Sequence, residues 1–263
     1  MKSTSYRSAI ILFLFSLNLS AAWNEPSPRL KTLGNTFGAD QRLAVTSNAY
    51  PWSALGYLEN IGCSGPMVSK NLVLTAAHCV IDPATKKLRT DLNHFLPNMV
   101  NGSSAYQSQI VHVWWGTNDP DNYRADDWAI MLLKENLGDT VGWWGIFGNG
   151  DNYSTVSVAG YSGDFMEGRT AGAHFGCNVR SPVNTDFILH DCHTSRGSSG
   201  GPMFVMENNA AMIVGINVAE YRKGGEVSLH LPYYSDEYAN IAVRVGRFLP
   251  TVKELRATYD ARQ

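Results

Sequence analysis

Several signatures of common protein classes are missing from this sequence of 263 residues. It has no run of Lys or Arg, and its 21 basic residues are nearly balanced by 23 acidic ones. Because phosphate binding needs clustered positive charge, we expect no nucleic-acid partner. The sequence also has no phosphate-binding loop, no CxxC or HxxxH pair and no EF-hand spacing. We therefore predict neither a metal ion nor any other cofactor.

Long apolar runs are scarce as well, and the clearest one lies near the N-terminus. Residues 9–17 are mostly apolar, follow Lys2 and Arg7, and precede small residues that end at Ala22. This three-part pattern predicts a secretory signal peptide over residues 1–22, and hence a secreted or periplasmic protein without stable membrane association. An uncleaved anchor is the alternative interpretation.

The chain has only four cysteines, which are Cys63, Cys79, Cys177 and Cys192. An even number of cysteines in an exported protein predicts disulfides, two in this case. Three pairings are possible. The local one joins Cys63 to Cys79 and Cys177 to Cys192, closes two short loops, and is favoured.

Helical periodicity is rare in the chain. After residue 40, short β-branched or aromatic stretches alternate with Gly, Asn, Asp and Pro, a pattern typical of an all-β sandwich or barrel. Residues 23–40 lack this pattern and are interpreted as a propeptide or an N-terminal arm. Apolar residues three or four apart predict one amphipathic helix from Phe248 to Tyr259. Strands are predicted at residues 52–58, 71–75, 110–115, 128–133, 155–159, 187–190 and 212–218.

Two motifs contain a base and an acid. In residues 74–79 (LTAAHC), small residues let the backbone turn behind His78. Because the ordinary pKa of histidine is near neutrality, His78 is suited to act as a general base. In residues 126–133 (DDWAIMLL), Asp127 directly precedes an apolar strand. Burying a carboxylate there is costly unless a group such as an imidazole N–H binds it. Asp126 is interpreted as a turn residue.

A third motif, GSSGGP at residues 197–202, contains the candidate nucleophile Ser199. Its glycines permit a tight loop in which backbone N–H groups point to one place. Two such donors beside a serine can hold a developing oxyanion. A Gly/Ser stretch alone is weak evidence, but this one follows the histidine and the aspartate in the order that a His-Asp-Ser triad requires.

Together these motifs resemble those of the chymotrypsin-like serine peptidases, which share the order His, Asp, Ser. Further segments, residues 38–42, 50–56, 158–164, 190–194 and 212–218, resemble the bacterial V8-like, or glutamyl endopeptidase, branch. The resemblance extends from about residue 37 to residue 247. It implies two packed six-stranded antiparallel β-barrels with a C-terminal α-helix, and it assigns residues 41–263 to a trypsin-like serine peptidase domain.

The resemblance also implies the roles of individual residues. His78, Asp127 and Ser199 would form a catalytic triad that hydrolyses peptide bonds through an acyl-enzyme. The N–H groups of Gly197 and Ser199 would form the oxyanion hole. The expected partners are protein or peptide substrates, and the expected oligomeric state is a monomer. A catalytically inactive homologue that acts as a secreted binding protein is the alternative, and an esterase with the same triad is a third reading.

Two positions depart from the sequence pattern of the peptidases that this chain resembles. Ser198 stands where trypsin-type enzymes have the aspartate that receives a new N-terminal amine, so zymogen activation of that type is not expected. Asn217 stands where glutamyl endopeptidases have a histidine that meets the substrate carboxylate, whereas Thr194 matches a residue of their pocket. Asn217 carries no charge, so we predict a weakened or absent glutamate preference. His193 could compensate, but a solvent-facing loop histidine is the simpler interpretation.

Overall fold

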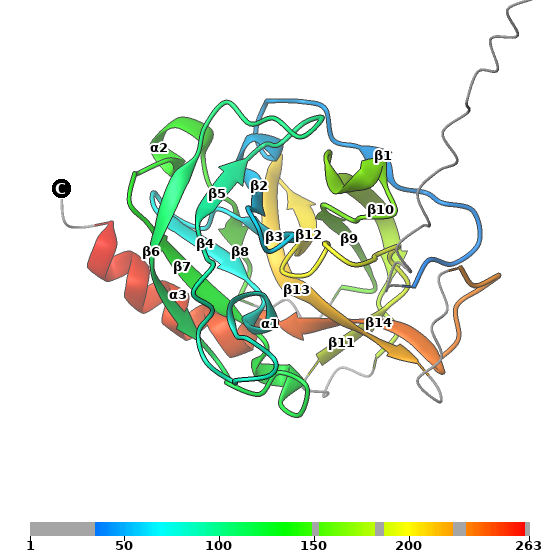
Figure 1. Cartoon of the computed structure of the whole chain (residues 1–263). Helices are drawn as coiled ribbons and strands as arrows, with labels where there is room; N and C mark the ends of the chain where they lie inside the picture. Colours follow the sequence, from blue (N-terminus) through cyan, green and yellow to red (C-terminus); the bar gives the residue numbers. More distant parts are fainter. Residues whose placement is uncertain (1–34, 149–152, 182–186, 223–229, 261–263) are drawn as a thin grey trace, which may run out of the picture. The chain divides into compact units, whose positions relative to one another are not determined.

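The computed structural model describes residues 35–148, 153–181, 187–222 and 230–260 (Figure 1). The predicted signal peptide lies outside these residues, as does the predicted arm or propeptide up to residue 34. Within the described ranges, no helix is both long and apolar enough to traverse a bilayer.

Two largely antiparallel sheets dominate the described chain, as the sequence predicts. The first has six strands in the order β3-β2-β5-β6-β7-β4, and it closes where Met67, just after β3, bridges Val73 of β4. The sequence of β4 is continuously apolar up to Thr75 because every residue of this strand is buried. The strands are β2 (Leu55–Leu58), β3 (Cys63–Pro66), β4 (Leu72–Thr75), β5 (His94–Pro97), β6 (Ser108–Trp115) and β7 (Ala129–Leu133).

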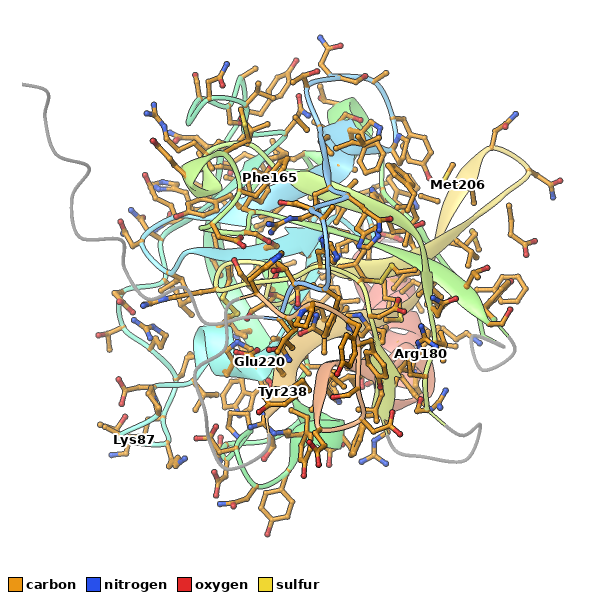
Figure 2. The ribbon with its side chains drawn as sticks, turned by 90° about the vertical axis from the view of Figure 1, so that its right-hand side faces the viewer. Lys87, Phe165, Arg180, Met206, Glu220 and Tyr238 are labelled. Atoms are coloured by element: carbon orange, nitrogen blue, oxygen red, sulfur yellow. A yellow bond between two sulfur atoms is a disulfide. The ribbon has the colours of Figure 1, made fainter. Side chains whose placement is uncertain are left out.

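The second sheet follows the path β1-β10-β9-β12-β13-β14-β11, with β8 paired in parallel to β13. Because β1 and β8 contain only two residues each, six longer strands form the body of this sheet. Its β12–β13 hairpin turns at Asn208 and Asn209, which both have positive φ, close to the exposed Met206 (Figure 2). The strands are β1 (Leu43–Ala44), β8 (Gly145–Ile146), β9 (Thr155–Gly160), β10 (Gly172–Asn178), β11 (Phe187–His190), β12 (Pro202–Glu207), β13 (Ala210–Arg222) and β14 (Tyr238–Arg244).

The predicted strands are present, with shifted ends. Residues 187–190 form β11 as predicted, whereas β13 extends beyond the predicted 212–218 because its pairing continues along β14. The prediction of a strand over residues 52–58 is wrong for the first three residues. These residues form the 3-10 helix η1 (Trp52–Ala54), which is closed by a hydrogen bond to the carbonyl of Pro51.

Helix α3 (Val245–Tyr259) connects the two sheets. It follows β14 directly and begins slightly before the predicted Phe248, which is fully buried together with Val252. Arg256 donates from Nε to the carbonyl of Val68, just after β3, over 2.6 Å. The helix thus continues the second sheet in sequence and packs on the first in space. The remaining short helices include α1 (Ala77–Val80), α2 (Gly138–Val141), η2 (Arg124–Asp126) and η4 (Met166–Gly168).

Buried aromatic rings fasten the two halves as well. Trp144 and Phe204 are fully buried and meet edge to face, with ring centroids 5.0 Å apart. Trp52 contacts both of them, with centroid distances of 6.1 Å. Edge-to-face pairs of this kind add to the free energy of burial. These contacts fix the position of one sheet relative to the other, and the candidate site lies between the two sheets.

Candidate active site

His78 lies in α1, which begins two residues after Thr75, the last residue of β4. Its neighbour Cys79 forms a disulfide with Cys63 of β3, so α1 is tied covalently to the first sheet. Thr75 adds a hydrogen bond of 2.9 Å from Oγ1 to the carbonyl of Ser64. The second predicted disulfide, between Cys177 and Cys192, is also present. The imidazole therefore projects from a turn that is held on both sides.

Asp127 follows η2 and is only 1% exposed. Its Oδ2 lies 2.9 Å from His78 Nδ1, and its Oδ1 accepts the backbone N–H of His78, also over 2.9 Å. Both carboxylate oxygens of Asp127 therefore bind His78, which fixes the position and the plane of the imidazole ring. The neighbouring Asp126 binds Arg247 instead.

The environment of His78 shifts its pKa. Burial disfavours the imidazolium, but the negative charge of Asp127 and its hydrogen bond favour it more strongly, so the pKa of His78 is raised above its ordinary value of 6.5. The side chain remains 33% exposed, which leaves the ring edge accessible from solvent. A ring held in this way can accept a proton from a neighbouring hydroxyl.

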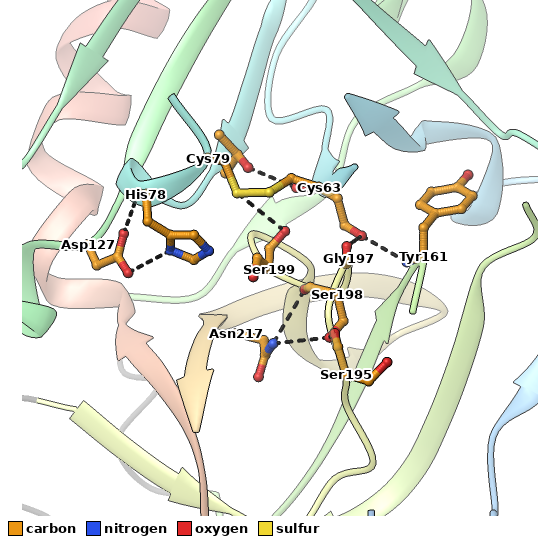
Figure 3. The surroundings of a disulfide bond; sticks show 12 residues. Cys63, His78, Cys79, Asp127, Tyr161, Ser195, Gly197, Ser198, Ser199 and Asn217 are labelled. Carbon is orange, nitrogen blue, oxygen red and sulfur yellow. Dashed lines mark hydrogen bonds and ion pairs between the residues drawn. A yellow bond between two sulfur atoms is a disulfide. The ribbon is translucent and has the colours of Figure 1, made fainter. Parts of the chain in front are cut away.

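Ser199 lies in the loop before β12, on the far side of His78 from Asp127 (Figure 3). Its carbonyl accepts the N–H of Ser64 over 2.8 Å. The next residue, Gly200, has φ of +78°, and a Cβ there would lie 2.4 Å from the carbonyl oxygen of Ser64. Among the described residues no hydrogen bond joins Ser199 Oγ to His78, and in enzymes without bound substrate such contacts are often long.

Two backbone N–H groups of the same loop have no acceptor within the described part of the chain. They belong to Gly197 and Ser199, whereas the N–H of Ser198 between them donates to the carbonyl of Ser195 over 3.0 Å. Gly197 has φ of +102°, and a Cβ at this position would lie 2.3 Å from the carbonyl oxygen of Tyr161. Only glycine therefore fits. The two unpaired N–H groups form a pair of donors of the kind that an oxyanion needs.

The candidate triad residues line one pocket with two of the three predicted substrate-binding residues, Thr194 and Asn217. Arg124, Arg196 and Glu220 contribute charges to the same pocket. The third predicted residue, His193, does not lie there. It is buried rather than solvent-facing, forms a 2.8 Å hydrogen bond from Nε2 to the carbonyl of Phe37, and lines a different pocket.

Asn217 is 4% exposed, and its Nδ2 donates to the carbonyl and the hydroxyl of Ser198, each over 3.4 Å. His190 lies close to it and is fully buried. Burial lowers the pKa of His190 to about 4, so this ring is neutral near pH 7. Neither residue brings a positive charge to this part of the pocket.

Ser64 is a site residue that the sequence does not reveal. Its hydroxyl donates to the carbonyl of Gly197 over 2.7 Å and accepts the N–H of Tyr161 over 2.8 Å. It therefore holds the loop that presents both unpaired N–H groups. Its partner in the loop is 133 positions away, so no local pattern could indicate this contact.

Comparison with known proteins identifies a matching family model and several relatives. A family model described as trypsin matches residues 41–240. The glutamyl endopeptidase of Bacillus licheniformis is 27% identical over 190 residues, which cover 68% of this chain and 57% of that protein. A trypsin-like protease of Streptomyces glaucescens is 24% identical over 184 residues, covering 63% of this chain and 66% of that protein. The chain thus spans less than two thirds of either relative.

Solved structures share the fold. A Glu endopeptidase in complex with MPD has a TM-score of 0.67 at 21% identity, covering 84% of this chain and 99% of that one. The protease Anisep from Arthrobacter nicotinovorans has a TM-score of 0.61 at 20% identity, covering 82% of this chain and 99% of that one. These likenesses confirm the predicted pair of β-barrels with a C-terminal helix.

Proposed function

Because the chain belongs to the trypsin family of serine peptidases, we propose that it is a secreted serine endopeptidase with His78, Asp127 and Ser199 as its triad. The observation that carries the proposal is that Asp127 makes two hydrogen bonds of 2.9 Å to His78, one to the backbone N–H and one to the ring. Ser199 lines the same pocket as these two residues. Secretion rests on the signal-peptide pattern of residues 1–22.

The geometry supports the following sequence of events. Ser199 Oγ attacks the substrate carbonyl while His78 Nε2 takes its proton, and Asp127 stabilises the resulting imidazolium. The oxygen of the tetrahedral intermediate accepts hydrogen bonds from Gly197 and Ser199. His78 then protonates the leaving amine, and water hydrolyses the acyl-enzyme by the same steps.

A fluorophosphonate probe and casein digestion test the proposal. The processed wild-type protein should be labelled and should digest casein, whereas Ser199→Ala should do neither. A variant of the exposed Ser47, Ser47→Ala, is the matched control and should behave as wild type. A folded wild-type protein that resists labelling would support the inactive homologue instead.

The described N-terminal arm also bears on maturation. Asn35 is fully buried, and its carbonyl accepts hydrogen bonds from Asn240 Nδ2 over 2.9 Å and from Thr194 N–H over 3.3 Å. Removing residues 35–40 would break these contacts next to the proposed pocket. We therefore place any propeptide cleavage before Asn35, and N-terminal sequencing of secreted protein tests this.

The pocket around Asn217 favours weak selectivity for the substrate residue that precedes the cut bond. Asn217 is a neutral amide and the His190 beside it is neutral near pH 7, so neither residue offers a charge to a glutamate side chain. We expect kcat/KM for a peptide with Glu at this position to exceed that for its Ala counterpart by less than about a hundredfold. Asn217→His should increase the ratio, and Asn217→Gln, which stays neutral, should not.

A further inference from the structure

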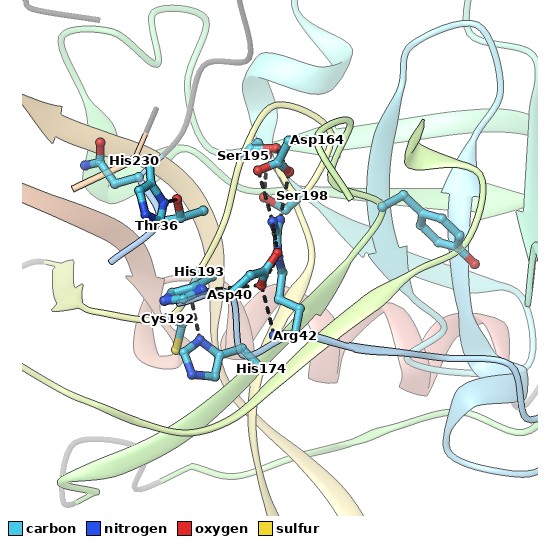
Figure 4. A network of polar contacts seen from close by, with 12 residues as sticks. Thr36, Asp40, Arg42, Asp164, His174, Cys192, His193, Ser195, Ser198 and His230 are labelled. Carbon is cyan, nitrogen blue, oxygen red and sulfur yellow. Dashed lines mark hydrogen bonds and ion pairs between the residues drawn. The ribbon is translucent and has the colours of Figure 1, made fainter. Parts of the chain in front are cut away.

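An ion cluster centred on a buried arginine lies beside the loop that contains Ser195 and Ser198 (Figure 4). At its centre is Arg42, whose side chain is 3% exposed. The guanidinium binds Asp164 through two hydrogen bonds of 2.8 and 3.0 Å, and Asp40 through bonds of 2.8 to 3.3 Å. Its Cζ also lies 5.0 Å from the ring centroid of Phe165, which Figure 2 labels. Bidentate pairs of this kind are geometrically specific and strong when buried.

The two carboxylates differ in what they touch beyond Arg42. Asp40 lies in the N-terminal arm, with His193 Nδ1 3.4 Å away. Asp164 accepts a hydrogen bond from the hydroxyl of Ser195, which lies in the loop before the proposed nucleophile. Burial alone would raise the pKa of Asp164, but Arg42 and Ser195 hold it below its ordinary value, so the carboxylate stays charged.

A second contact joins the same two segments. Gly163, next to Asp164, donates its N–H to the carbonyl of Arg196, next to Ser195, over 2.7 Å. In a trans peptide the carbonyl and the following N–H point in opposite directions. The bond that fixes the carbonyl of Arg196 therefore also directs the N–H of Gly197 away from Gly163, toward the site.

Ser195 supports the loop in a third way. Its carbonyl accepts the N–H of Ser198 over 3.0 Å and the hydroxyl of Ser198 over 2.6 Å, so the turn that places Gly197 begins at Ser195. Moving Ser195 would move the whole turn. Neither Asp164 nor Arg42 lines the pocket of the triad.

We propose that Arg42 and Asp164 are positioning residues, which hold the oxyanion-binding N–H of Gly197 in place through Ser195. This inference rests on the proposed peptidase function and adds to it a support for the oxyanion hole from residues outside the pocket of the triad.

The test compares Asp164→Asn and Ser195→Ala with Asp40→Asn, the matched control on the same guanidinium. All are assayed with the peptide p-nitroanilide that the wild type cuts best, and rates are divided by the number of sites that a fluorophosphonate titrates. For Asp164→Asn and Ser195→Ala we expect kcat to fall roughly 10- to 100-fold with little change in KM. Asp40→Asn should stay near wild type, and Ser195→Thr, which keeps the hydroxyl, should recover most of the rate.

A second readout separates positioning from stability. The aldehyde of the same peptide forms a tetrahedral adduct whose oxygen needs the Gly197 N–H, so its inhibition constant should rise by the same factor as kcat falls. If Asp164→Asn does not fold, Ser195→Ala decides the matter. Variants with a lower melting temperature but unchanged kcat per titrated site would overturn this inference and leave the proposed function intact. An inactive wild type would overturn both.

Discussion

Asp127 contributes its charge as well as its two hydrogen bonds to His78. In Asp127→Asn the shape is kept, but an amide can donate as well as accept and allows the wrong imidazole tautomer. We expect kcat/KM near pH 8 to fall by about 10⁴-fold, as in triads of this type. The measurement is steady-state hydrolysis of a peptide p-nitroanilide. Asp126→Asn is the matched control, because that neighbour pairs with Arg247 outside the triad.

In the proposed mechanism, the same pair determines the pH dependence of activity. His78 acts as a base only when it is neutral, and Asp127 raises its pKa above 6.5. The kcat/KM of the wild type should therefore rise with pH through an inflection above that value. In Asp127→Asn the residual activity should inflect at lower pH. An inflection that does not move would show that another group controls the profile.

At the scale of elements, α3 makes a testable contribution to stability. Phe248 is fully buried where the helix packs on the body. Phe248→Ala removes most of this side chain and leaves a cavity, so the free energy of unfolding should fall by about 3–5 kcal/mol. Urea denaturation followed by fluorescence measures it. Lys253→Ala, on the exposed side of the same helix, should have little effect.

The elements that the sequence predicts well are those whose apolar pattern is local. Strand β11 and helix α3 show it within a few residues. By contrast, β3 has the sequence CSGP, with low intrinsic strand preference, and pairing with β2 decides its conformation. Strand β10 contains two glycines and was missed for the same reason.

The candidate site likewise has residues that the sequence predicts and supporting contacts that it does not. The positions of His78, Asp127 and Ser199 follow from short motifs, because the turns that present them need particular neighbouring residues. The supporting contacts of Ser64 and Arg42 do not, because their partners lie 133 and 122 positions away. The burial of His193 likewise depends on the N-terminal arm, which covers it.

At the scale of the whole described molecule, buried histidines make stability depend on pH. Burial lowers the pKa values of His174 and His190 to about 4, from 6.5 in an unfolded chain. Below pH 6.5 the unfolded chain therefore binds protons that the folded one does not, and stability falls until about pH 4. The raised pKa of His78 acts in the opposite direction and offsets part of the loss.

We expect the free energy of unfolding to be roughly 2–5 kcal/mol lower at pH 4.5 than at pH 7. Urea titrations at the two pH values measure the difference. In His190→Gln, which cannot take up a proton, the difference should shrink. Equal stability of the wild type at both pH values would contradict the assignment of these rings as buried and neutral.

The packing of α3 against the first sheet has a consequence for biosynthesis. Arg256 reaches the carbonyl of Val68, and Tyr259 lies against Trp114 of β6, with ring centroids 5.6 Å apart. A ribosome delivers the strands of the first sheet before this helix, so the surface that the helix covers stays exposed to water until the helix has been synthesised. A message that stops short of β14 would yield a product with that surface bare, which is the kind of product that quality-control proteases degrade.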